Sequence, residues 1–97
     1  MDQLTRICEM ETIYKEASAS LSRLRDAWEE YRTLALRLAE LESYYTGPLW
    51  RADYEADEAS LLPQDLPRGV LSQDGVYDLL AQRDQLLRQI TAALKEE

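Results

Sequence analysis

The chain has 97 residues, of which 19 are acidic and 11 are basic, so its formal net charge at neutral pH is −8. This length suits one small domain, and the excess of negative charge disfavours direct binding to nucleic-acid phosphates or to anionic lipid headgroups. Hydrophobic residues make up 45% of the chain and charged residues 31%, a composition typical of a folded helical protein rather than of a disordered one.

The first 46 residues predict one long amphipathic helix. No Gly or Pro interrupts the chain from Ile7 to Tyr45, and apolar residues recur there at the 3-4 spacing of a coiled-coil seam. Asp2 is expected to cap the helix start, and Gly47-Pro48 to end the helix near Thr46. The seam consists of Ile7, Tyr14, Leu21, Trp28 and Ala35, and of Met10, Ala17, Leu24, Tyr31, Leu38 and Tyr45.

The segment Ser18-Ala19-Ser20 is the weakest place in this predicted helix. Its two serine hydroxyls compete for backbone hydrogen bonds. The pattern therefore leaves open whether the helix continues through this segment or kinks there.

A connector, residues 47–71, follows the long helix. It holds all three prolines and two of the three glycines. A short helix is predicted over about residues 51–59, followed by an extended passage around Pro63 and Pro67. Its apolar residues are expected to pack, since a bare loop of about 25 residues is unusual in a compact domain; they are Leu49, Trp50, Tyr54, Leu61, Leu62, Leu66 and Val70.

The last predicted helix covers about residues 72–94. Ser72 is a favourable N-cap, and Leu71 with Val76 has the spacing of a hydrophobic staple. Gly69 is expected to permit a turn before the cap, and Gly75 a close helix approach. The apolar stripe of this helix is interrupted by Arg83 and consists of Val76, Leu79, Leu80, Leu86, Leu87, Ile90 and Leu94.

These elements predict one all-α domain over residues 1–97, in which the long and the shorter helix form an antiparallel, coiled-coil-like hairpin bridged by an ordered connector. The second helix can cover only about half of the first. The uncovered seam favours homodimerisation through the N-terminal half, because side chains left in water forgo burial comparable to the stability of a small domain. The interface candidates in this half are Ile7, Met10, Tyr14, Leu21, Leu24 and Trp28.

The acidic run of the connector is the second candidate site, with Asp53, Glu55, Asp57 and Glu58. Three interpretations stay open: carboxylates that are solvated or cap a helix, a surface that recognises a basic partner, and a cation site. The calcium-loop pattern fails, because the sixth position from Asp53 is glutamate and not glycine. Arg68 is expected to neutralise Asp53 or Asp57, and no metal site is predicted.

Trp50 and Tyr54 lie four residues apart and share one helical face. They are expected to pack onto the end of the long helix. The alternative is that they serve as interface anchors.

Several motifs follow one another in a specific order from the connector into the last helix: Pro48-Leu49-Trp50, Asp53-Tyr54-Glu55, Pro63, Asp65-Leu66, Arg68-Gly69-Val70-Leu71-Ser72 and Asp74-Gly75-Val76-Tyr77-Asp78-Leu79-Leu80. This order resembles an uncharacterised family of small bacterial proteins. That family is known by an Asp-Tyr-Glu motif and is classed as a domain of unknown function. The resemblance implies a free-standing bacterial protein of about this size, and it implies no particular activity.

No catalytic residue or cofactor is predicted, because the sequence has no histidine, no glycine-rich phosphate loop and no metal-ligand spacing. The single cysteine, Cys8, is expected to be structural and suits a reducing compartment. No signal peptide or membrane span is evident, so a cytoplasmic location is expected. The sequence favours an interaction module that binds a protein partner, with an acidic inhibitor or immunity-type protein that blocks a basic, nucleic-acid-handling surface as the alternative.

Overall fold

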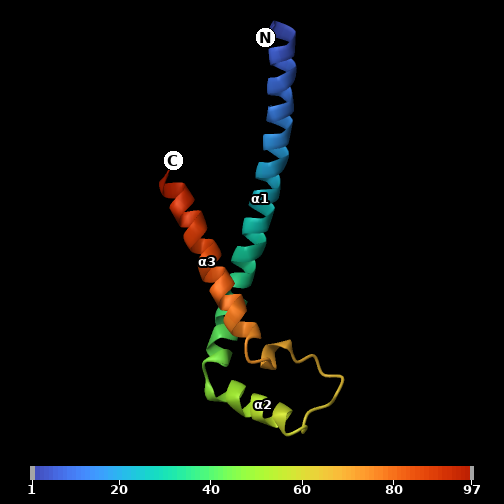
Figure 1. Cartoon of the computed structure of the whole chain (residues 1–97), viewed down its shortest axis with the longest axis vertical. Helices are drawn as coiled ribbons and strands as arrows, with labels where there is room; N and C mark the ends of the chain where they lie inside the picture. The colour runs from blue at the N-terminus through green and yellow to red at the C-terminus, as the bar shows by residue number, and fades with distance from the viewer. Residues whose placement is uncertain (1, 97) are drawn as a thin grey trace. The chain divides into compact units, whose positions relative to one another are not determined.

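The computed structural model describes residues 2–96, and in this range it contains helices and no strand (Figure 1). The elements are α1 (Gln3–Tyr45), α2 (Pro48–Glu58), the 3-10 helix η1 (Gly69–Leu71) and α3 (Gly75–Lys95). The predicted all-α architecture, with a long first helix, a short helix in the connector and a C-terminal helix, is confirmed. The chain divides into two units, residues 1–38 and residues 39–97, and each is described by itself.

Helix α1 begins and ends within one residue of its predicted limits. The backbone N–H of Thr5 donates to Oδ1 of Asp2 at 2.7 Å, which is the predicted cap, and hydrogen bonding to Thr5 lowers the pKa of the Asp2 carboxyl. The helix runs without a break through Ser18-Ala19-Ser20. At its end, Thr46 bonds back to the carbonyl of Glu42 through both its N–H and its hydroxyl, at 3.0 and 2.9 Å.

Helix α2 begins at Pro48, three residues before the predicted start. Proline is favourable at the first helical position, since the N–H that it lacks would have no partner there. Pro48 therefore starts α2, in addition to its predicted role in ending α1.

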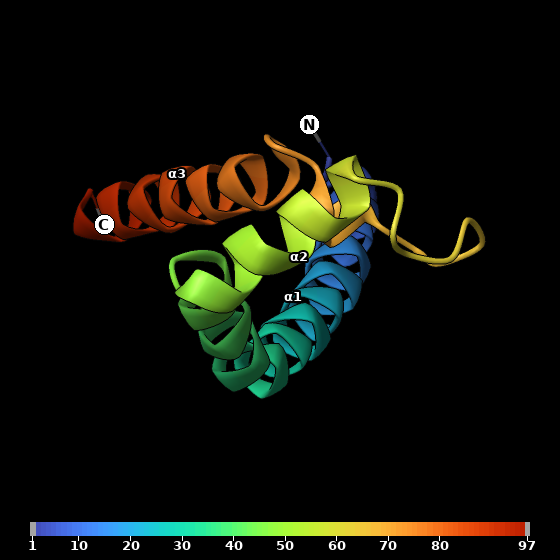
Figure 2. The same cartoon turned by 90° about the horizontal axis from the view of Figure 1, so that it is seen from below.

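Helix α2 ends in a Schellman motif one residue before the predicted end. Ser60 has a φ of 60°, its N–H donates to the carbonyl of Asp57, and the N–H of Leu61 donates to that of Ala56, both at 3.0 Å. This is the usual place for glycine. After this turn, the chain forms a loop that leads back to the start of α3 (Figures 1 and 2).

The return passage is not wholly extended as predicted, because it contains η1, and α3 begins at Gly75 rather than at residue 72. The N-cap of α3 is Asp74, without a side-chain hydrogen bond, so the prediction of Ser72 as the N-cap is wrong by two residues. Ser72 still bonds to the start of the helix, since its Oγ accepts a hydrogen bond from the N–H of Gly75 at 3.0 Å. The predicted staple residues, Leu71 and Val76, are 6% and 3% exposed and form the buried core among residues 2–96.

Other apolar residues of the second unit are more exposed than predicted. Leu49 and Leu61 are 68% and 75% exposed, so these two connector residues do not pack. Leu79, Leu86, Ile90 and Leu94 of α3 are exposed to between 44% and 66%. The core of this unit is small because the connector reaches α3 mainly through Leu71.

The C-terminal end of α1 and α3 run in opposite directions within the second unit (Figure 1). An ion pair joins them, in which Nη1 of Arg83 lies 3.2 Å from Oε2 of Glu42. Arg83 also donates to Asp84 at 2.9 Å. The hydrogen bonds to Asp84 and to Glu42 raise the pKa of the Arg83 guanidinium. The ion pair with Glu42 gives the arginine that interrupts the apolar stripe a partner on α1.

The Gly75→Ala substitution is expected to lower the free energy of unfolding by about 2 kcal/mol, because the added methyl group overpacks the start of α3. A Cβ at this position would lie 2.4 Å from Oγ of Ser72 and 2.8 Å from the backbone oxygen of Gly69. The close approach that requires glycine is thus to the residues just before α3 and not to another α-helix. Urea unfolding followed by circular dichroism measures the effect.

Gly69→Ala is the matched control, since a Cβ at Gly69 meets nothing within 4 Å. Its free energy of unfolding should stay within about 0.5 kcal/mol of the wild-type value. Equal stabilities of the two variants would contradict the packing argument.

Candidate functional site

The apolar seam of α1 is uncovered along its N-terminal part. No residue of α1, all of which the structure describes, is buried. The seam residues Tyr31, Ala35 and Leu38 are half-buried. The six interface candidates of this half are exposed to between 49% and 70%: Ile7 54%, Met10 52%, Tyr14 70%, Leu21 66%, Leu24 65% and Trp28 49%.

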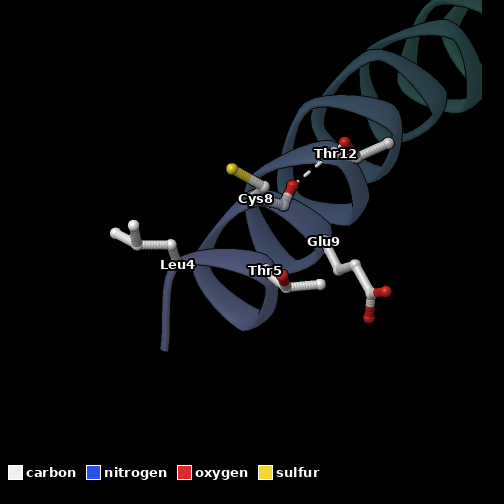
Figure 3. Close-up of a pocket in the computed structure, with 5 residues that line it drawn as sticks. All are labelled: Leu4, Thr5, Cys8, Glu9 and Thr12. Atoms are coloured by element: carbon white, nitrogen blue, oxygen red, sulfur yellow. Dashed lines mark hydrogen bonds between the residues drawn. The ribbon is translucent and has the colours of Figure 1, made fainter. Parts of the chain in front are cut away.

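A shallow depression near the start of α1 is lined by residues of this one helix: Leu4, Thr5, Cys8, Glu9 and Thr12 (Figure 3). Leu4 and Cys8 lie on one side of the helix and Glu9 on another, and the Thr12 hydroxyl donates to the Cys8 carbonyl at 3.1 Å. Cys8 is exposed. All five lining residues belong to this one helix, so within the first unit the depression has no second wall that would enclose a substrate.

The aromatic residues Tyr45, Trp50 and Tyr54 form a cluster in the second unit. The ring of Trp50 meets Tyr45 edge to face at a centroid distance of 5.1 Å and stacks on Tyr54 at 5.2 Å. Nε1 of Trp50 donates to the carbonyl of Val70 at 2.8 Å, and Nε2 of Gln73 donates to the Tyr54 hydroxyl at 2.7 Å. The predicted packing of Trp50 onto the end of α1 is confirmed, and the cluster joins α1, α2 and the approach to α3.

A groove borders this aromatic cluster. Besides the three rings, it is lined by Thr46, Gly47, Arg51 and Gln73. It therefore offers flat apolar surfaces next to one cationic and one amide side chain, which is a surface suited to a peptide or another protein.

Two carboxylates of the acidic run have partners within the chain. Asp53 accepts a hydrogen bond from the Tyr44 hydroxyl at 2.6 Å, and Asp57 forms an ion pair with Arg68. The predicted neutralisation by Arg68 is confirmed for Asp57, and Arg68 also donates to the Pro63 and Leu66 carbonyls. The Arg68 contacts hold the passage that follows α2 against this helix, and the contact of Tyr44 with Asp53 joins α1 to α2.

The other two carboxylates of the run, Glu55 and Glu58, are exposed. Glu55 lies 3.6 Å from Nε of Arg51, which is also exposed, and such a contact contributes little in water. Within residues 2–96, no three His, Cys, Asp or Glu side chains are grouped so that they could hold a metal ion.

Sequence reasoning missed three of these contacts: Tyr44 with Asp53, Gln73 with Tyr54, and Trp50 with the Val70 carbonyl. Each joins residues from 9 to 20 positions apart. Helical periodicity reports neighbours three or four positions apart, so no local signal identifies these pairs.

The hydrogen bond to Asp53 raises the pKa of the Tyr44 phenol to about 12. Because this pKa is above that of an unfolded tyrosine, the stabilisation by this contact is complete below about pH 10 and is lost as the pH rises through 12. In an ultraviolet titration, a last step near pH 12 is expected from Tyr44, and Asp53→Asn should lower the pKa of this phenol. Tyr44→Phe identifies the group, since it should remove this last step and leave the other steps unchanged.

A model of the family described as "Domain of unknown function (DUF4298)" matches residues 7–92. The chain belongs to this family. The match covers all of α2, η1 and the connector and most of α1 and α3, so the DUF4298 region includes both the uncovered seam and the aromatic cluster. The predicted resemblance to a family of unknown function is confirmed.

No curated protein and no solved structure matches the chain. For the helices within residues 2–96, none combines the length and the apolar character that crossing a bilayer requires. Membership of the DUF4298 family assigns no activity, so a functional assignment has to be argued from the surfaces described above.

Proposed function

We propose that the protein is a non-catalytic cytoplasmic interaction module that forms a homodimer through the N-terminal part of α1. The observation that carries this proposal is the uncovered seam from Ile7 to Trp28, whose large side chains are about half to two-thirds exposed. Isolated apolar side chains are normal on a protein surface, whereas a continuous row along one face of a helix marks an interaction site.

The free energy available from this seam suits a stable dimer. Covering six large side chains on each of two copies contributes on the order of 10 kcal/mol, even at partial burial. This gain exceeds the lower range of what association costs in lost rotational and translational freedom, about 4 kcal/mol.

Light scattering coupled to size-exclusion chromatography of the full chain tests the proposal. The expected mass at micromolar concentration is twice that of one chain, and it should change little between low and high salt because the contact is apolar. A monomer at all accessible concentrations would contradict the proposal.

A second candidate function is that of an acidic protein that blocks a basic, nucleic-acid-handling surface. The net charge of −8 and the exposure of Glu55 and Glu58 support it. Asp53 and Asp57 support it less, since Tyr44 and Arg68 already hold their carboxylates. Salt separates the two candidates: charge-driven partner binding weakens steeply with ionic strength and should weaken further in the Glu55→Gln/Glu58→Gln variant.

A further inference from the structure

We infer that α1 pairs with α1 of a second copy in antiparallel orientation, about a centre at Ser18-Ala19-Ser20. In this register Ala17 lies opposite Leu21 of the second copy, and Met10 lies opposite Trp28 of the second copy. The inference rests on the proposed homodimer and adds the orientation and the register of its two helices.

The sizes of the seam residues favour this orientation. A parallel, in-register pair would place the two Trp28 side chains, one from each copy, opposite each other in one layer. In another layer it would place the two Ala17 side chains opposite each other. The first layer is overpacked and the second leaves a void, and both lower stability. In the antiparallel register every seam layer contains at least one large side chain, and no layer contains two tryptophans.

Small residues lie beside the seam at the middle of the pair. Next to the two-fold axis, Ala17 lies in the seam opposite Leu21 of the second copy, with Ser18 and Ser20 on the two flanks of the seam. Short side chains let two helix backbones approach closely. Ser18-Ala19-Ser20, the predicted weakest place in α1, therefore has a structural role in the pair. Helix α1 is continuous through this segment.

Charges beside the seam are also complementary in this register. Glu11 and Arg25 occupy the same flank of α1, seven residues before and seven residues after Ser18. Antiparallel pairing places each opposite the other, twice per dimer, and such flanking charges set helix orientation in coiled coils. Both side chains are exposed, and their present ion pairs are long, at 4.0 Å to Lys15 and 3.6 Å to Asp26.

The overlap includes the whole uncovered part of the seam, and at its ends it reaches the half-buried Tyr31 of each copy. It runs from residue 7 to residue 31, about 37 Å of helix, and leaves out Ala35 and Leu38, which are already half-buried. The two α1 helices then reach residue 39 at opposite ends of the pair, about 60 Å apart. The dimer therefore presents two copies of the aromatic groove and is suited to bivalent binding.

Electron-spin distance measurement tests the orientation without any substitution, since Cys8 is exposed and is the single cysteine of the chain. A nitroxide on each Cys8 should give a distance of about 35 Å, because 22 residues of helix rise separate the two positions in the register. A distance below about 20 Å would indicate a parallel pair and overturn the inference. A shift of about 10 Å would indicate a register displaced by one heptad, which overturns the stated pairing. A labelled monomer would refute the proposed homodimer itself.

Charge reversal provides an independent test. Glu11→Arg should raise the dimer dissociation constant about fivefold, and Arg25→Glu in the same chain should restore it. The matched alternative is Glu11→Arg with Arg6→Glu, since Arg6 faces Glu11 of the second copy only in a parallel pair. Rescue by Arg6→Glu instead of Arg25→Glu would overturn the antiparallel orientation.

Discussion

Leu21→Asp is expected to raise the dimer dissociation constant at least about 100-fold. Leu21 is 66% exposed in the single chain, so the substitution leaves the fold of one copy largely intact. In the proposed dimer the substitution places two carboxylates, one from each copy, in an apolar seam. At each site the burial of a leucine side chain is lost and a charge has to be desolvated. Sedimentation velocity over a range of concentrations measures the change.

Leu36→Asp is the matched control for this prediction. Leu36 lies on the same helix and is 79% exposed, but it is off the seam. The two substitutions have the same helix-propensity cost, so only the position relative to the seam differs. Equal weakening of association by both would contradict the proposed interface, and circular dichroism should show similar helix content.

Trp50→Ala is expected to lower the free energy of unfolding of the second unit by about 3 kcal/mol. The substitution removes the hydrogen bond to the Val70 carbonyl and the ring contacts to Tyr45 and Tyr54. Large-to-small substitutions of packed aromatic residues cost amounts of this order. This unit has little else to hold the connector, since Leu71 and Val76 are its buried residues within the described chain.

Trp50→Phe separates the two contributions of this side chain. Phenylalanine keeps most of the ring contacts and loses the hydrogen bond, so a loss of about 1 kcal/mol is expected. Chemical unfolding followed by circular dichroism measures both variants, and hydrogen exchange at the Leu71 and Val76 amides should be faster in Trp50→Ala. An alanine variant as stable as the phenylalanine variant would show that the ring contacts contribute nothing.

These predictions concern two different surfaces of the molecule. Seam substitutions should change association and leave the connector unaffected, whereas Trp50 substitutions should loosen the connector and leave self-association largely unchanged. Measuring both properties on each variant therefore tests whether the exposed row of α1 and the aromatic cluster have separate roles.

Local sequence determined the three helices and several of their ends. Asp2 caps α1, and Leu71 and Val76 are buried as the staple spacing predicted, because each acts on backbone or side chains within a few positions. The sequence predicted that Arg68 neutralises Asp53 or Asp57, and the folded chain selects Asp57. The predicted start of α2 is three residues late, because Pro48 both ends α1 and occupies the first position of α2.

Tertiary structure alone decided which distant groups meet. The bonds of Tyr44 to Asp53, Trp50 to the Val70 carbonyl and Arg83 to Glu42 join different elements, and these depend on how the chain turns after α1 and after α2. Helical periodicity records which face of a helix is apolar, but it does not record what that face meets. The exposed seam was therefore predictable as a pattern, whereas the contacts that close the connector required the folded chain.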